Sequence, residues 1–295
     1  MHSTKLTNLL FVAFSTLATS QTAKLTSVPN FGTNPSSLTM NIYVPNTLAT
    51  KPPIIIVPHP CGGSAQDTFS RVATNLPTYA DKLGLILIYP ATPTTSACWD
   101  VRSNASMTHD GGGDTLGLIS MVNYILTKYA GDPTKVFVTG SSSGGMMTNL
   151  LLAAYPDVFA AGAVSSGAPV GCWDGTTPNS IGGPYCQAGK TYSATQWGEF
   201  AVESDRGFNG TRPRFMTWHG TADRVVAYVN LGDQLKQWSS VLGVQWTGNV
   251  TDSPEKGYTK MVYGDGTRMV GYSALGVGHM VPFHAEEMLE FFGLL

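Results

Sequence analysis

The fold of this chain is indicated by one stretch, Val136-Phe137-Val138-Thr139-Gly140-Ser141-Ser142-Ser143-Gly144-Gly145. A β-branched, apolar run leads directly into a Gly-Ser-Ser-Ser-Gly turn, and the run 146–154 follows with helix-compatible spacing. Strand, tight turn and helix in this order are the context in which a G-x-S-x-G match presents a nucleophilic serine. The stretch therefore predicts a sharp turn between strand and helix, with a reactive hydroxyl at its top.

Within this turn, Ser142 is the candidate nucleophile, because only Ser142 has glycine both two residues before and two residues after it. Gly140 and Gly144 have a steric reason, since a Cβ at either position would strike the neighbouring strand or helix. Ser141 and Ser143 are the rival nucleophiles, and a plain polar turn with an N-cap is the structural alternative. The amide after Ser142 would lie at a helix N-terminus, where unpaired N–H groups favour negative charge.

Size and composition restrict the class of protein. The 295 residues, 42% of them hydrophobic, are enough for one large α/β domain with a substantial core. A net charge of −2, with 12% charged residues and no basic stripe, argues against a nucleic-acid partner. No repeat or linker separates a second domain, so residues 21–295 are expected to form a single domain without a carbohydrate-binding module.

The N-terminus has the pattern of a secretory signal. A short polar start precedes an apolar run at 9–14, and small residues at 18–20 offer a cleavage site. The apolar run is too short to span a bilayer. We therefore expect residues 1–20 to be a signal peptide of a secreted, extracellular protein with no membrane anchor. Three N-glycosylation sequons fit the same context and begin at Asn104, Asn209 and Asn249.

Four cysteines fit two disulfides in an oxidising compartment, and three pairings are possible. We favour Cys61–Cys98, which would join two loops that each follow a buried strand. The second favoured pair, Cys172–Cys186, would close a short loop rich in Gly and Pro. A zinc site is the alternative, but the sequence lacks the C-x-x-C spacing that such sites commonly use.

The rest of the chain alternates apolar runs with amphipathic ones. Strand-like runs lie at 38–44, 53–58, 85–89, 159–165 and 214–219, with a further pair at 258–262 and 268–272. Helical spacing is expected at 67–83 with a break or kink at Pro77, from an Asp114 cap to 129, and at 231–242 and 286–292. Mostly continuous apolar strands alternating with helices predict an α/β fold, with a mostly parallel sheet covered on both faces. The stretch 167–196 lacks periodicity and is expected to be an insertion or lid.

A serine hydroxyl needs an adjacent base, which an acid in turn orients, and in this kind of fold the chain order is Ser, acid, His. His279 lies in a glycine-flanked loop after every plausible acid, which favours it over His284 and over His219, which precedes the acid. Asp223 follows a predicted strand, as an orienting carboxylate should. The remaining acids are more typical of surface or turn positions, and they are Asp205, Asp233 and Asp265.

Two backbone N–H groups are needed to stabilise the oxyanion that an ester carbonyl forms under attack. One candidate is the amide of Ser143, directly after the nucleophile. The other should come from the loop after an early strand, His59-Pro60-Cys61-Gly62-Gly63. We expect the Cys61 amide to be this donor, with Gly62 as the alternative, and His59 to be structural.

Six motifs together resemble a known family. They are His59-Pro-Cys-Gly-Gly63, Cys98-Trp-Asp100, Gly111-Gly-Gly-Asp114, Gly140-Ser-Ser-Ser-Gly-Gly-Met-Met-Thr-Asn149, Trp218-His-Gly-Thr-Ala-Asp223 and Gly276-Val-Gly-His279. In order, over about 25–295, they resemble the fungal type B feruloyl esterases. Acetylxylan esterases and polyhydroxybutyrate depolymerase-like enzymes belong to the same broader set. The resemblance implies an α/β-hydrolase fold, a secreted plant cell-wall esterase, and no metal or organic cofactor. It also implies a catalytic triad, which would consist of Ser142, Asp223 and His279.

The early loop reads His-Pro-Cys-Gly-Gly-Ser rather than the Cys-Thr-Gly pattern of acetylxylan esterases, and this favours the feruloyl side. Segments 76–81 and 237–244 also resemble the feruloyl esterases more closely than the acetylxylan esterases. The function predicted is hydrolysis of feruloyl esters on plant cell-wall xylan or arabinoxylan, by a monomer. The alternatives are an acetylxylan esterase and a catalytically inactive carbohydrate-binding protein. Trp99 and Trp173 either stack on a phenolic ring or pack within their loops.

Overall fold

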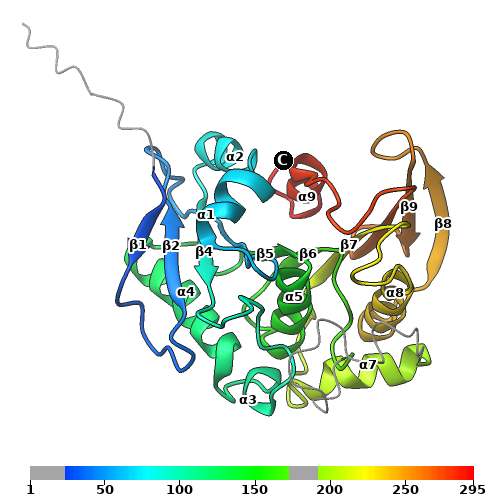
Figure 1. Ribbon diagram of the computed structural model, residues 1–295, viewed down its shortest axis with the longest axis horizontal. Helices are drawn as coiled ribbons and strands as arrows, with labels where there is room; N and C mark the ends of the chain where they lie inside the picture. Colours follow the sequence, from blue (N-terminus) through cyan, green and yellow to red (C-terminus); the bar gives the residue numbers. More distant parts are fainter. Residues whose placement is uncertain (1–23, 173–191) are drawn as a thin grey trace, which may run out of the picture.

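The computed structural model describes residues 24–172 and 192–295, which form a ten-stranded sheet with helices on both faces (Figure 1). The strand order is β1-β2-β4-β3-β5-β6-β7-β10-β9-β8. The central strands, from β4 to β10 in this order, pair in parallel. Strands β1 and β2 at one edge, and β9 and β8 at the other, pair antiparallel. The predicted mostly parallel α/β sheet is confirmed.

The strands are β1 (Thr26–Val28), β2 (Thr39–Tyr43), β3 (Ile54–Ile56), β4 (Ile86–Ala91), β5 (Val136–Ser141), β6 (Ala161–Ser165), β7 (Arg214–Gly220), β8 (Trp246–Thr251), β9 (Tyr258–Tyr263) and β10 (Met269–Ala274). The helices are α1 (Ala65–Asp67), α2 (Leu76–Leu83), α3 (Asn104–Met107), α4 (Gly113–Tyr129), α5 (Ser143–Ala154), α7 (Ala194–Glu203), α8 (Val229–Leu242) and α9 (Ala285–Phe291). A π-helical turn, Thr68–Val72, follows α1.

Two apolar layers hold the helices to the sheet, because alternate side chains of each strand point to opposite faces. On one face, α4, α5 and α8 pack on residues such as Ile54, Ile56 and Val138. On the other face, α2 and α9 pack on residues such as Ile55 and Phe137. Figure 1 shows the same division, with α2 and α9 on one side of the sheet and α4, α5 and α8 on the other. Helix α7 covers α8 rather than the sheet itself.

The segment 67–83 is broken, as expected, but the break lies before Leu76 and not at Pro77. Ser64 caps α1 by accepting a hydrogen bond from the amide of Asp67, the π-helical turn follows, and α2 begins at Leu76. Pro77 lies in the first turn of α2, where a residue without an N–H removes no helical hydrogen bond. The proline therefore begins a helix instead of breaking one.

The expected cap of α4 is also wrong, because Gly112 precedes the helix and Asp114 lies within its first turn. The Asp114 carboxylate instead accepts a hydrogen bond of 2.9 Å from the amide of Asp100.

Strand β8 was not expected, since its almost wholly exposed residues give no apolar pattern. Trp173, Cys186 and most of 167–196 lie outside the described residues, so the lid and the Cys172–Cys186 pairing stay predictions.

Candidate active site

The turn between β5 and α5 is as tight as its glycines suggest. A Cβ on Gly140 would lie 2.4 Å from the carbonyl oxygen of Gly144, and one on Gly144 would lie 2.1 Å from the carbonyl oxygen of Pro58. Ser142, between them, has φ 55° and ψ −121°. This left-handed φ is unfavourable for a residue with a side chain and is held here by the surrounding backbone. The turn thus presents the Ser142 hydroxyl at the carboxyl end of β5.

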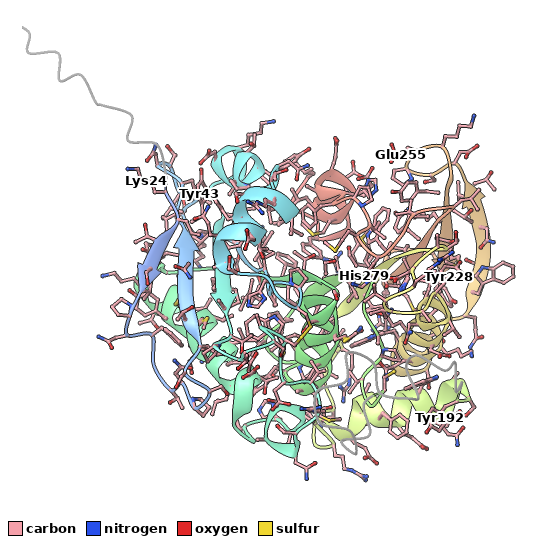
Figure 2. All side chains as sticks on the ribbon, in the orientation of Figure 1. Lys24, Tyr43, Tyr192, Tyr228, Glu255 and His279 are labelled. Atoms are coloured by element: carbon pink, nitrogen blue, oxygen red, sulfur yellow. A yellow bond between two sulfur atoms is a disulfide. The ribbon has the colours of Figure 1, made fainter. Side chains whose placement is uncertain are left out.

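Three loops at this edge bring Ser142, His279 and Asp223 into one hydrogen-bonded chain. His279 Nε2 lies 2.9 Å from Ser142 Oγ, and His279 Nδ1 lies 2.8 Å from Asp223 Oδ2. The three residues follow β5, β10 and β7, whose carboxyl ends meet at one edge because these strands are parallel. Figure 2 shows His279 near the middle of the molecule, away from Lys24 and Tyr192 at its periphery.

Asp223 is held ionised in spite of its burial. Burial alone would raise the pKa of this carboxyl group, but hydrogen bonds from His219, His279 and the amides of Val225 and Val226 lower it to about 2. The two amides donate to Oδ1 at 2.8 and 3.0 Å. Because an ionised carboxylate only accepts hydrogen bonds, His279 must carry its proton on Nδ1. The Nε2 lone pair of His279 then faces the Ser142 hydroxyl as a base would.

The His279 loop is anchored by a residue that the sequence did not single out. The hydroxyl of Ser166, after β6, donates to the carbonyl oxygen of His279. On the other side, the amide of Ala222 donates to the carbonyl oxygen of Val277 at 2.9 Å. A lone serine after a strand carries no pattern that predicts this contact. The anchors fix the backbone on which the imidazole is mounted.

The rival residues lie elsewhere. His284 stacks on Trp218 with ring centroids 4.5 Å apart, so it is a packing residue and not part of the hydrogen-bonded chain. His219 contacts Asp223 but reaches the carboxylate from within β7. Asp233 pairs with Lys236 at 3.1 Å. Asp205 pairs with His109, and Asp265 accepts a hydrogen bond from Thr267 in its own turn.

The candidate oxyanion donors are the Ser143 amide and an amide of the loop after β3. The Ser143 amide begins α5, where helical N–H groups have no intrahelical acceptor. The Gly62 amide already donates to the carbonyl oxygen of Ser96 at 3.0 Å. The Cys61 amide has no acceptor among the described residues. Of these two loop amides, the one on Cys61 is therefore available to bind a substrate oxygen.

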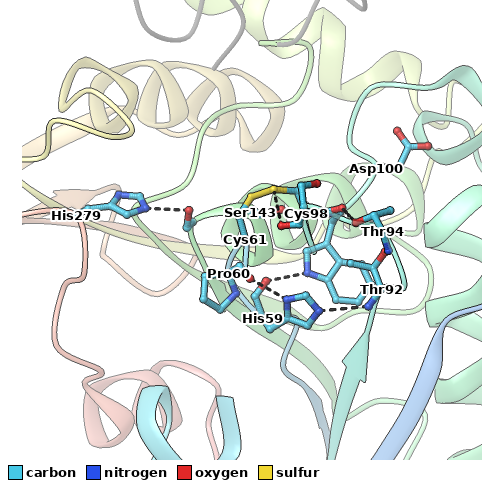
Figure 3. The surroundings of a disulfide bond; sticks show 12 residues. His59, Pro60, Cys61, Thr92, Thr94, Cys98, Asp100, Ser143 and His279 are labelled. Carbon is cyan, nitrogen blue, oxygen red and sulfur yellow. Dashed lines mark hydrogen bonds between the residues drawn. A yellow bond between two sulfur atoms is a disulfide. The ribbon is translucent and has the colours of Figure 1, made fainter. Parts of the chain in front are cut away.

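The predicted Cys61–Cys98 disulfide is present, and Figure 3 shows it next to Ser143. The Trp99 amide donates to Ser143 Oγ at 2.8 Å, and the Trp99 indole N–H donates to the carbonyl oxygen of His59 at 2.8 Å. Trp99 is buried, so of its two expected roles the structure supports loop packing and not stacking on substrate.

Both ring nitrogens of His59 bind backbone groups. Nδ1 lies 2.8 Å from the carbonyl oxygen of Pro60, and Nε2 accepts from the Thr92 amide at 3.2 Å. Burial lowers the pKa of this imidazole. These contacts agree with the expected structural role of His59, which stiffens the loop that carries Cys61 (Figure 3).

Chemically, the arrangement offers an aligned hydroxyl, a base and an oriented acid, together with two amides that have no acceptor among the described residues. Such a set can transfer an acyl group through a serine ester. Over the two described ranges, no three His, Cys, Asp or Glu side chains gather in a way that could hold a metal ion. In the same ranges, every helix is too short or too polar to cross a lipid bilayer.

A mostly parallel sheet with helices on both faces and a serine on the turn after β5 defines the α/β-hydrolase fold. Within that fold, the chain belongs to the esterase PHB depolymerase family, which residues 38–246 match. It is a carboxylic ester hydrolase.

Two curated relatives and one solved structure are similar over most of the chain. Feruloyl esterase B of Neurospora crassa is 48% identical over 95% of this chain and 96% of its own length. An acetylxylan esterase of Coprinopsis cinerea is 42% identical over 92% of this chain and 73% of its own length. The structure of an acetyl xylan esterase from Aspergillus awamori has a TM-score of 0.87 at 36% identity, covering 92% of this chain and all of that one.

Proposed function

We propose that this protein is a secreted serine esterase that hydrolyses feruloyl esters of plant cell-wall xylan or arabinoxylan. The observation that carries the proposal is the continuous hydrogen-bonded chain from Ser142 through His279 to Asp223. The substrate class comes from the relatives, which are named feruloyl esterase B and acetylxylan esterase. It agrees with the cell-wall esterase that the sequence motifs imply.

In the proposed reaction, His279 Nε2 accepts the proton of the Ser142 hydroxyl as its oxygen attacks the ester carbonyl. The amides of Ser143 and Cys61 donate to the oxyanion that forms. The same proton then passes from His279 to the departing sugar oxygen, which leaves an acyl group on Ser142. A water molecule, deprotonated by His279, attacks the acyl carbon. The acid is released as that proton passes from His279 to Ser142 Oγ, while Asp223 stabilises each imidazolium.

Two observations favour a feruloyl over an acetyl group. The feruloyl esterase of Neurospora crassa is more similar in sequence than the acetylxylan esterase of Coprinopsis cinerea, at 48% against 42%. The loops of Asp223 and His279 also expose apolar side chains, with Val225 44%, Leu275 75% and Met280 49% exposed. Met280 Sδ lies 4.0 Å from the Ser141 hydroxyl, so this thioether is near the nucleophile, where an aromatic ring would gain contact.

An acetylxylan esterase is the second candidate. Its support is the fold similarity to the Aspergillus awamori acetyl xylan esterase, at a TM-score of 0.87. An inactive carbohydrate-binding protein is disfavoured because the three side chains are present and aligned.

The proposal includes residues 1–20 as a signal peptide and residues 21–295 as one monomeric catalytic domain. The Cys61–Cys98 disulfide supports an oxidising compartment. Asparagines 104, 209 and 249 are all exposed, which supports their use as glycan acceptors.

Ser142→Ala tests the nucleophile. We expect hydrolysis of methyl ferulate and of 4-nitrophenyl acetate to fall by at least roughly 10³-fold, with an unchanged thermal unfolding midpoint. Turnover near that of the wild type would remove Ser142 from the mechanism.

Wild-type rates on methyl ferulate and on acetylated xylan decide between the two esterases. A kcat/KM that favours acetylated xylan would replace the feruloyl proposal with the acetyl one. If neither substrate turns over and a serine-reactive phosphonate does not label the protein, the inactive binding protein becomes the better reading.

A further inference from the structure

Asp223 has a second histidine neighbour that the proposed reaction does not use. His219, in β7, is fully buried, and its Nε2 lies 3.1 Å from Asp223 Oδ2. The same Nε2 lies 2.8 Å from the carbonyl oxygen of Val226. Asp223 Oδ2 is also the oxygen that contacts His279 Nδ1, at 2.8 Å. One carboxylate oxygen therefore faces two imidazoles.

The contacts of His219 define where its proton lies. The carbonyl of Val226 can only accept a hydrogen bond, so Nε2 of His219 must be the protonated nitrogen. Nδ1 of His219 is buried and has no hydrogen-bond partner among the described residues. A second proton there would leave a buried N–H unpaired, which is costly. The ring is thus neutral, with its single N–H directed between Val226 and Asp223.

The titratable groups around His219 leave this assignment intact. Among the described residues, Asp223 is the charged group that pairs with the ring, and His279 lies beyond it on the same oxygen. The Tyr228 ring approaches edge-on, with centroids 6.1 Å apart, and its hydroxyl is bound to Ser273 Oγ at 2.7 Å. The Tyr228 hydroxyl is therefore engaged elsewhere.

We propose that His219 is a positioning residue that fixes the Asp223 carboxylate and shares its Oδ2 with His279. The amides of Val225 and Val226 hold Oδ1, so His219 supplies the constraint on the other oxygen. Sharing Oδ2 also weakens the hold of the carboxylate on the imidazolium of His279. That proton must leave His279 in every turnover, so the sharing favours its release.

This inference rests on the proposed function, because it takes His279 as the base. It predicts a change that simple packing by His219 does not predict. Loss of the His219 donor should leave Oδ2 to His279 alone, so that His279 holds its proton more tightly. The acid limb of the pH profile of kcat/KM should then move to higher pH.

The experiment compares His219→Phe, which keeps a ring and loses the donor, with His219→Gln, which keeps an N–H. The substrate is 4-nitrophenyl acetate, whose turnover does not depend on feruloyl or acetyl preference. For His219→Phe we expect kcat to fall roughly 10- to 100-fold, the effect of one lost hydrogen bond to a charged group, with little change in KM. We expect its acid limb to move up by about half a pH unit. His219→Gln should restore both values most of the way.

His284→Phe is the matched control, because the His284 ring also stacks in the core but has Glu287 rather than Asp223 as its acidic neighbour. It should leave the acid limb in place. The proposal is overturned if His219→Phe lowers kcat without moving the limb, or if His219→Gln behaves like His219→Phe. Ser142→Ala is assayed beside them to separate the His219 proposal from the proposed function. Retained turnover in Ser142→Ala would contradict the proposed serine esterase function itself.

If His219→Phe does not fold, ¹⁵N spectra of histidine-labelled wild-type protein give the answer directly. Nε2 protonation with a bare Nδ1 on His219 supports the proposal. A doubly protonated ring, or a proton on Nδ1 alone, overturns it.

Discussion

Single residues set how closely the nucleophile turn approaches the neighbouring strand, and Gly144 makes the tightest contact. An added Cβ would lie 2.1 Å from the Pro58 carbonyl oxygen, so backbone rather than a flexible side chain would have to move. We expect Gly144→Ala to lower the free energy of unfolding by roughly 3 kcal/mol, the upper range for overpacking. Denaturant unfolding measures this loss, and kcat should fall with it because Ser142 shifts.

The control is Gly232→Ala in α8, where an added Cβ meets no atom within 4 Å. A helical alanine there should leave stability unchanged or raise it by up to about 1 kcal/mol. Similar losses in both variants would mean that the close approach to Pro58 is not what constrains position 144.

Asp223 also makes stability depend on pH. Its pKa in the folded protein, about 2, lies below the ordinary value of 3.8. The stabilisation is therefore fully present above about pH 4 and is lost as the pH falls towards 2. We expect the difference in unfolding free energy between wild type and Asp223→Asn to shrink by about 2 kcal/mol over this interval. A difference that does not vary between pH 5 and 2 would contradict the lowered pKa.

At the scale of elements, the Cys61–Cys98 disulfide joins the loop after β3 to the loop after β4. The first loop carries the Cys61 amide, and the second carries Trp99, whose amide holds Ser143 Oγ. We expect Cys61→Ser combined with Cys98→Ser to lower kcat roughly 10- to 100-fold, less than complete loss of an oxyanion donor. KM should change little, because the tether acts on the transition state. Steady-state kinetics well below the unfolding midpoint measure both.

Thr94→Val is the control for that double variant. It removes the hydrogen bond of 3.1 Å from Thr94 Oγ1 to the Cys98 carbonyl oxygen but keeps the tether. Its kcat should stay near the wild-type value. If the double variant also keeps its kcat, the loop holds its shape without the disulfide and the amide assignment weakens.

For the whole molecule, local patterns predicted the central sheet because its strands are continuous apolar runs. The Gly-Ser-Ser-Ser-Gly turn predicted the position of Ser142 because the steric constraints on such a turn are set by residues adjacent in sequence. The β8 strand was missed because exposed edge residues need no apolar pattern. The break before α2 was misplaced because a proline in a first turn and one in a helix interior look alike in sequence.

The contacts of Ser166 and His219 were beyond sequence reasoning for a different reason. Each joins residues that only the strand order brings together, such as Ser166 after β6 and His279 after β10. Chain order disfavours His219 as the base because it precedes Asp223, yet the turn after β7 folds the carboxylate back onto it. Chain order can rank candidates, but it does not give the distance between them.

The outer strand β8 has a practical consequence for producing the protein. Within the described part of the chain, β8 ends the sheet with its outer backbone groups unpaired and exposes Trp246 and Val250. Such an edge is a template for intermolecular strand pairing. Asn249, within this strand, is a sequon asparagine, so a sugar chain there would act as a steric shield. We expect Asn249→Gln, secreted from a glycosylating host, to self-associate at concentrations where Asn209→Gln stays monodisperse in light scattering. Protein from a bacterial host carries no glycan at any sequon. If it proves poorly soluble, the cause would then be association through the exposed β8 edge and not misfolding.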